Sequence, residues 1–191
     1  MLRARHWTCA LVCIAVAGTG AASGAPARNA SQSSTEAAFD AVDHVLARKD
    51  LNGIPDYRDD RSTSESLVMS FYNAINRGEF SRAYGYYAEE TRPDFVTWVR
   101  GYQDTRSIKV ITGPGEGDPG AGTLYWHQPV AIEAESYDGE RTVYGGCYEI
   151  RMAAPLNQEA PPFHPMTITS GSLTKSTQPL EKSLPKSCMP E

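Results

Sequence analysis

The sequence predicts an α+β fold in which three N-terminal helices pack on a strongly curved antiparallel sheet of four to five strands. Between residues 62 and 104, apolar residues recur three and four positions apart, which is the spacing of one helix face. From residue 107 to residue 174 they tend to alternate with polar residues, which is typical of strands with one buried side. Helices that precede a run of strands indicate an α+β domain with the helices on one face of the sheet.

The first 24 residues have the composition of a secretory signal peptide. Arg3 and Arg5 precede an apolar run over residues 7–17, and small residues follow it. The run is much shorter than the roughly 20 residues that a membrane span needs. We therefore expect cleavage after Gly24, export to the periplasm or the medium, and no membrane span in the mature chain.

Residues 25–61 predict a flexible lead in front of the domain. The first part is small and polar, without sustained periodicity. A possible short helix follows over residues 36–49, where four apolar residues have helical spacing: Phe39, Val42, Val45 and Leu46.

Three helices are expected over residues 62–104. Ser62 and Glu65 have the spacing of a capping box at the start of the first, and Gly78 is a suitable end. The second begins near Glu79, and the third follows Pro93, a residue that the first turn of a helix tolerates. The expected buried residues are Leu67, Val68, Phe71, Tyr72 and Ile75 in the first, Phe80, Ala83, Tyr84 and Tyr87 in the second, and Phe95, Trp98, Val99 and Tyr102 in the third.

Strands are expected over residues 107–112, 124–135, 141–152 and 166–174. The second and third alternate most clearly and are joined by Asp138-Gly139, a strong hairpin signal. The segment 113–122 is rich in Gly and Pro and predicts a flexible connection. It lacks the Gly-Lys-Ser/Thr ending of a phosphate-binding loop, and its two acids would repel phosphate. The domain is thus expected to span residues 62–175, with a polar tail over 176–191.

Cysteine count and net charge narrow the class of protein. Two of the four cysteines lie in the predicted signal, which leaves Cys147 and Cys188 as a possible disulfide that tethers the tail, or as two free thiols.

The full chain has 18 basic and 23 acidic residues and a net charge of −5. Loss of Arg3 and Arg5 leaves 16 basic residues against 23 acidic ones, so the mature charge is −7. An acidic chain of this kind argues against a general nucleic-acid binder.

The middle of the chain resembles the nuclear-transport-factor-two-like superfamily, which includes ketosteroid isomerases and polyketide cyclases. Residues 71–80 (FYNAINRGEF), 95–105 (FVTWVRGYQDT) and 145–151 (GGCYEIR) are similar, in this order, to the opening helices and the central strand of exported bacterial members. The match covers about residues 64–175. The resemblance implies a cone-shaped α+β fold and, because those members have no established activity as a group, no particular reaction.

Aromatic residues are the strongest candidates for a binding site. On a cone-shaped fold, five of them are expected to line a pocket for a small apolar ligand: Trp98, Tyr102, Trp126, Tyr144 and Tyr148. The other reading of this set is a filled core.

Residues for catalysis are harder to find. An isomerase-like site needs a carboxylate opposite a tyrosine. The candidate acids are Asp94, Glu133 and Glu149, and His127 is a possible general base. None of them aligns with a known catalytic position, so no catalytic residue is assigned. The scattered histidines indicate no metal site, and no motif indicates a cofactor.

These observations favour an exported, non-catalytic binding module of the cell envelope for a protein partner or a small apolar ligand. The alternative is an acid–base enzyme of the isomerase or cyclase type, which rests on fold analogy alone. A homodimer through the outer face of the sheet is a further expectation from the resemblance.

Overall fold

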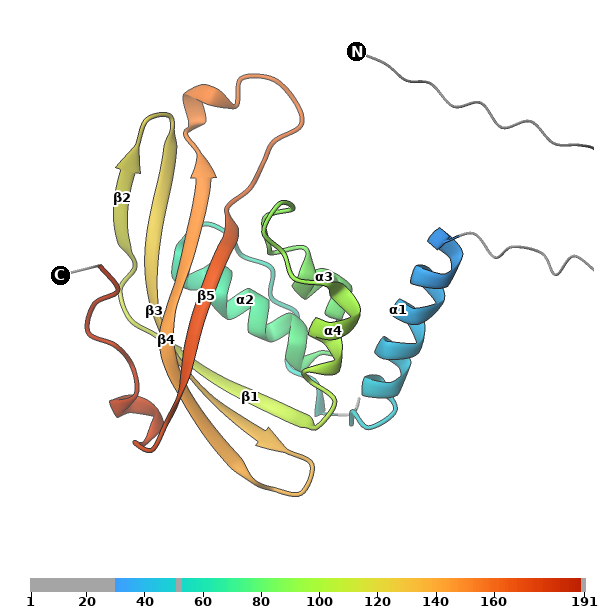
Figure 1. Ribbon diagram of the computed structural model, residues 1–191. Coiled ribbons are helices and arrows are strands. Elements are labelled where there is room, and N and C mark those ends of the chain that lie inside the picture. The colour runs from blue at the N-terminus through green and yellow to red at the C-terminus, as the bar shows by residue number, and fades with distance from the viewer. Residues whose placement is uncertain (1–29, 51–52, 190–191) are drawn as a thin grey trace, which may run out of the picture.

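The computed structural model describes residues 30–50 and 53–189, and within them it is an α+β fold (Figure 1). The predicted signal peptide, residues 1–24, and the start of the lead lie outside the described residues. The helices are α1 (Ala30–Leu46), α2 (Ser64–Asn76), α3 (Phe80–Tyr84) and α4 (Phe95–Arg100). The strands are β1 (Thr105–Thr112), β2 (Glu116–Gly120), β3 (Thr123–Ser136), β4 (Arg141–Ala153) and β5 (Thr167–Ser176). The described α-helices number four: three in the domain, as predicted, and α1, which includes most of the segment of the lead where a possible short helix was expected.

All five strands form one antiparallel sheet, in the order β1-β3-β4-β5 with β2 on the same edge of β3 as β1. The hairpin of β3 and β4 is its centre and is continuous in register from Thr123 opposite Ala153 to Glu135 opposite Arg141. Alternate residues of a strand point to opposite faces. In Figure 1 helices α2, α3 and α4 lie on one side of this sheet, and the C-terminal tail runs on the other.

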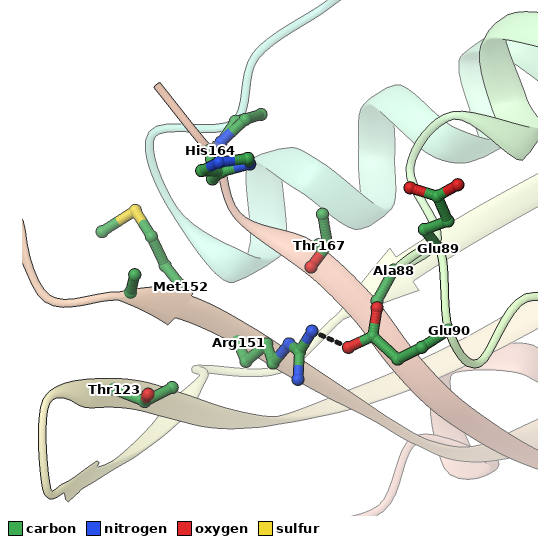
Figure 2. Close-up of a pocket in the computed structure, with 10 residues that line it drawn as sticks. Ala88, Glu89, Glu90, Thr123, Arg151, Met152, His164 and Thr167 are labelled. Carbon is green, nitrogen blue, oxygen red and sulfur yellow. Dashed lines mark hydrogen bonds and ion pairs between the residues drawn. The ribbon is translucent and has the colours of Figure 1, made fainter. Parts of the chain in front are cut away.

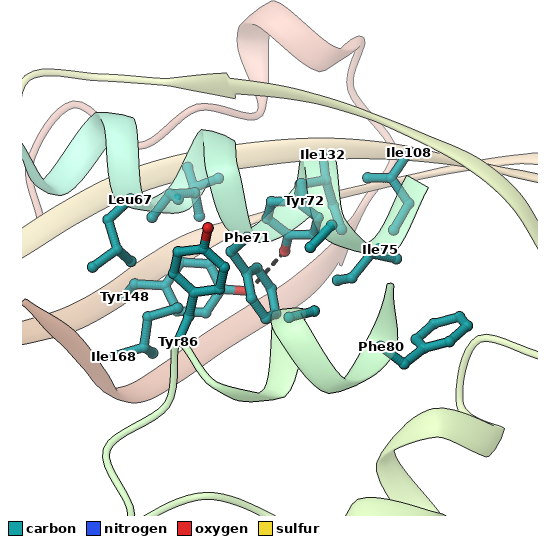
Figure 3. Close-up of a cluster of buried hydrophobic side chains, with 14 of the residues drawn as sticks. Leu67, Phe71, Tyr72, Ile75, Phe80, Tyr86, Ile108, Ile132, Tyr148 and Ile168 are labelled. Carbon is teal, nitrogen blue, oxygen red and sulfur yellow. Dashed lines mark hydrogen bonds between the residues drawn. The ribbon is translucent and has the colours of Figure 1, made fainter. Parts of the chain in front are cut away.

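The core lies between α2 and the helix-facing side of the sheet (Figure 3). Helix α2 contributes the stripe that its sequence predicted, including Leu67, Phe71 and Ile75, all of them fully buried. The sheet contributes apolar residues at alternate positions, because only one of its faces is turned to the helices: Val130, Ile132, Tyr148, Ile150 and Ile168.

The start of α2 differs from the predicted capping box. Thr63, rather than Ser62, is the N-cap, and its hydroxyl oxygen accepts a hydrogen bond from the Ser66 amide at 3.1 Å. Glu65 does not reach back to the cap, because its carboxylate accepts a hydrogen bond from the Gly115 amide at 3.2 Å. A contact distant in sequence has replaced the local one.

The part of the lead next to the domain is packed against it, in contrast to the expected flexible segment. The Arg58 amide donates to Asn73 at 3.0 Å, and the Asp60 amide donates to Ser70 at 2.9 Å, so this stretch follows α2. Helix α1 contacts α4 and buries Val45 in the core. The apolar spacing of the lead therefore marks a docked helix.

The prediction for residues 113–122 was wrong in part, since the flexible connection contains strand β2. Five of its residues pair with the start of β3, from Glu116 opposite His127 to Gly120 opposite Thr123. Gly122, with φ of 77°, makes the turn between the two strands. The first half of β3 extends beyond the end of β1, and the Gly/Pro segment fills the edge left there. This partner is not apparent in the composition of the segment.

The C-terminal tail covers part of the outer face of the sheet. Cys188 forms a disulfide with Cys147 of β4, with the Cα atoms 5.9 Å apart, which confirms the predicted bridge. Leu180 is buried, and a side chain at Gly145 would overlap the Ser183 carbonyl, so the tail backbone lies directly on β4. A second copy could not use this area unless the tail moved away, which weakens the expected homodimer through the outer face.

The described helices include none with both the length and the apolar character to cross a membrane. A disulfide is compatible with an oxidising compartment, as export would provide.

Candidate functional site

Helix α4 brings an aromatic cluster to the edge of the core. Asp94 begins the helix, and its carboxylate accepts a hydrogen bond from the Thr97 amide at 2.9 Å. One turn later Trp98 packs edge to face on Tyr102, with ring centroids 5.2 Å apart, and on Phe80 at 6.2 Å. Trp98 lies within this helix and Tyr102 just after its last residue, Arg100, so the two rings meet at the C-terminal end of α4.

A cavity of about 410 Å³ opens beside this cluster, between the end of α4 and the strands β1, β3 and β4. Three aromatic residues line it, namely Trp98, Tyr102 and Tyr144. The remaining lining is small, aliphatic or hydroxyl-bearing: Thr97, Gly101, Thr105, Ile108, Ile132 and Ala134. A concave apolar site with a few polar groups is the usual form of a small-molecule site. We call this space the aromatic cavity.

The structure brings three of the five expected pocket residues together and separates the other two. Tyr148 is 5% exposed and belongs to the core under the cavity. Trp126 lies towards the other end of β3, where it is opposite Gly117 on β2 and Ile150 on β4. Both residues face the helix side of the sheet, as their alternation predicted, but at different levels along the strands.

Sequence reasoning did not assign Ile108, Ile132 and Ala134 to this site. The alternation of β3 did place Ile132 and Ala134 on one face. Their position beside Trp98 depends on the register, which sets Ile108 opposite Ala134 and Ile132 opposite Tyr144. That register depends on the pairing of β1, β3 and β4, so the sequence of a single strand does not predict it.

Behind the aromatic cavity, the hydroxyl groups of Tyr72 and Tyr148 form a buried hydrogen bond of 2.7 Å (Figure 3). Burial raises the pKa of each of these tyrosines, and that of Tyr102, well above the ordinary value. All three side chains are therefore neutral at physiological pH and can donate or accept hydrogen bonds without carrying charge.

The candidate acids of an isomerase-like site lie away from this cavity. Asp94 caps α4, and its hydrogen bond with the Thr97 amide lowers the pKa of its carboxyl. Glu133 neighbours Ile132 and Ala134 along β3 and so points to the opposite face of the sheet. Glu149 is exposed on that same outer face, opposite His127. None of the three lines the aromatic cavity.

His127 lies in a row across the outer face, between Glu116 on β2 and Glu149 on β4. The Glu116 carboxylate is occupied by the tail, because it accepts hydrogen bonds from the Cys188 amide at 2.8 Å and the Ser187 hydroxyl at 3.0 Å. These hydrogen bonds lower the pKa of Glu116. Within residues 30–50 and 53–189, no set of three His, Cys, Asp or Glu side chains is placed to hold a metal ion.

A second cavity of about 410 Å³ lies at the other end of the sheet, where β3 and β5 begin and β4 ends (Figure 2). Its lining includes ionisable side chains, among them Glu89 and His164, beside the hydroxyls of Thr123 and Thr167. Arg151 and Glu90 form an ion pair on its wall, drawn as a dashed line in Figure 2. Charged side chains in its lining make this cavity a poorer site for a neutral apolar ligand than the aromatic cavity, whose lining has neither carboxylates nor basic groups.

No protein-family model, curated protein or solved structure matches this chain. The geometry of the cavities and the chemistry of their linings are therefore the basis for a functional proposal.

Proposed function

We propose that the chain is an exported binding module of the nuclear-transport-factor-two-like fold that takes a small apolar ligand in the aromatic cavity. The observation that carries this proposal is the lining, in which three aromatic rings and three aliphatic side chains surround a space of about 410 Å³. Pockets for small organic molecules have this size and chemistry. Helices on one side of a five-stranded antiparallel sheet support the fold that the resemblance implies, and the disulfide supports export.

An acid–base enzyme of the isomerase or cyclase type is the weaker alternative. It needs a carboxylate close to the bound substrate. Asp94 is used as a helix cap, while Glu133 and Glu149 lie on the outer face. The side chains that line the aromatic cavity offer hydroxyl groups and no carboxylate. Binding without turnover fits this lining better.

Tryptophan fluorescence provides the test, because Trp98 lies in the aromatic cavity. In a chain that begins at Ala25, Trp126→Phe leaves Trp98 as the sole tryptophan. Titration with N-phenyl-1-naphthylamine, a neutral apolar probe, should quench the Trp98 emission with a saturable dependence on probe concentration.

A matched pair of variants locates the bound probe. Ala134→Phe places a ring in the aromatic cavity and should abolish quenching, whereas Ala153→Phe does the same in the second cavity and should leave quenching unchanged. Absence of saturable binding in the parent chain, or loss of binding only with Ala153→Phe, would contradict the proposal.

A further inference from the structure

A smaller cavity of about 160 Å³ adjoins the aromatic cavity, and the two share Thr105, Ala134 and Tyr144 as common lining. Its other lining residues are polar or charged. The residue before β1 and the β3–β4 hairpin contribute three carboxylate side chains, those of Asp104, Glu135 and Glu140, and the hairpin also contributes the hydroxyls of Ser136 and Thr142. We call this space the acidic annex.

Cationic side chains surround the annex without lining it. Asp104 pairs with Arg48 at 2.7 Å, and Glu135 pairs with Arg106 at 3.3 Å and with Arg141 at 3.1 Å. The Glu135 side chain is 25% exposed, while those of Arg106 and Arg141 are 59% and 63% exposed. At Glu135, water therefore screens the two arginine charges more than the carboxylate, whereas in the Arg48–Asp104 pair the carboxylate is the more exposed group, at 69% against 45%.

Glu140 differs from the other two carboxylates. It begins the return from the hairpin turn, and its backbone carbonyl accepts a hydrogen bond from the Ser136 amide at 2.9 Å, which fixes its place at the annex. Among the described residues its side chain has no ion-pair partner within 4.0 Å. The Glu140 carboxylate is thus the one of the three that can pair with a positive charge on a ligand without first giving up an arginine.

The aromatic cavity favours positive charge for a separate reason. The faces of tryptophan and tyrosine rings carry negative partial charge, and proteins use rings of this kind to recognise organic ammonium groups. Trp98, Tyr102 and Tyr144 provide three such rings, and Tyr144 also belongs to the annex. Neither lining contains a lysine, arginine or histidine.

From these two observations we infer that the ligand is an organic cation, in which an apolar ring fills the aromatic cavity and a basic amine or ammonium group reaches the acidic annex. This inference rests on the proposed function and names the ligand class of the same site. Neutral and anionic ligands of the same shape would lose the interaction with Glu140 and with the ring faces.

Three naphthalene probes of nearly equal size test the charge preference by isothermal titration calorimetry at low salt. They are 2-naphthylmethylammonium, 2-naphthylmethanol and 2-naphthoate. We expect the ammonium probe to bind about three- to ten-fold more tightly than the alcohol, as one exposed ion pair and one cation–π contact allow, and the carboxylate to bind most weakly. The preference should shrink as salt is added.

Two variants with the same change of charge assign the preference to the annex. Glu140→Gln should remove the ion-pair part of the ammonium preference and leave only the smaller part that the aromatic rings supply, while the unchanged alcohol affinity shows that the cavity is intact. Glu149→Gln, on the outer face, should leave the preference as it is.

The outcomes separate the two proposals. If none of the probes binds, the proposed function fails and this inference fails with it. If all three bind equally, or the carboxylate binds best, the cavity still binds ligands but the inferred ligand class is wrong. An equal effect of Glu149→Gln and Glu140→Gln would also overturn the inference, since the preference would then come from the net charge of the chain.

Discussion

The phenolic oxygens of Tyr72 and Tyr148 lie 2.7 Å apart at a position where the two residues are 2% and 5% exposed. They connect the middle of α2 to the centre of β4, residues 76 positions apart in the chain. This buried hydroxyl pair links the helix layer to the sheet at one defined point.

Tyr148→Phe should lower the free energy of unfolding by about 1–3 kcal/mol, because it leaves the Tyr72 hydroxyl buried without its partner. Tyr72→Phe should have a similar effect. The double variant should lose clearly less than the sum, since no orphaned hydroxyl remains. Urea unfolding of the four proteins measures this, and additivity within about 0.5 kcal/mol would contradict a direct interaction.

The buried tyrosines should make stability fall at alkaline pH. Burial raises the pKa of Tyr72, Tyr148 and Tyr102, so the native state favours their protonated form. Their contribution is fully present below about pH 10, where an unfolded tyrosine is also protonated. Above that value the unfolded chain releases these protons first, and stability is lost by about 1.4 kcal/mol per pH unit for each tyrosine until the raised native pKa is reached.

Urea midpoints between pH 7 and pH 11 measure this fall. Lys49 has the opposite influence, because burial lowers its pKa from the ordinary value of 10.5 to about 8. Its contribution should therefore make stability rise as the pH goes from about 8 to 10.5. Comparison with the Tyr72→Phe/Tyr148→Phe variant at each pH removes this contribution. Equal alkaline slopes in the two proteins would show that the tyrosine pair does not titrate as expected.

Loss of the disulfide should destabilise the protein without unfolding it. The bridge joins residues 41 positions apart, and the chain-entropy model assigns about 4 kcal/mol to a loop of that length. Cys147→Ser/Cys188→Ser should show this loss in urea unfolding, and the reduced parent protein should match it. A difference below about 1 kcal/mol would mean that the buried Leu180 and the Glu116 hydrogen bonds suffice to hold the tail.

Helix α1 should contribute to the stability of the domain. Val45 is fully buried against the core, whereas Phe39 on the same helix is 66% exposed. Val45→Ala should lower the free energy of unfolding by about 2 kcal/mol, from two lost methylene equivalents and a small cavity. Phe39→Ala serves as the control and should change it little. Equal small effects would indicate that α1 does not unfold together with the domain.

Several parts of the fold could be predicted because they depend on local patterns. The stripe from Leu67 to Ile75 predicts α2, and the alternation around Ile132 and Ile150 predicts the two central strands. The Asp138-Gly139 turn lies where the hairpin reverses, with φ of 87° at Gly139. In each case the residues that determine the element lie within a few positions of one another.

Other parts depended on partners far away in the chain. Residues 116–120 have the composition of a loop, yet they form β2 because the edge of β3 offers unpaired backbone groups. Glu65 has the spacing of a capping box but binds the Gly115 amide instead. Neither result can be read from the composition of the segment itself.

The candidate site shows the same division. The sequence alone determined that Trp98 and Tyr102 belong to one apolar stripe at helical spacing and that Tyr144 belongs to the apolar face of a strand. Only the tertiary structure decided that these three rings share a cavity while Tyr148 fills the core and Trp126 lies elsewhere. The physical reason is that periodicity specifies which side of an element is buried, whereas strand register and helix docking specify what it meets there.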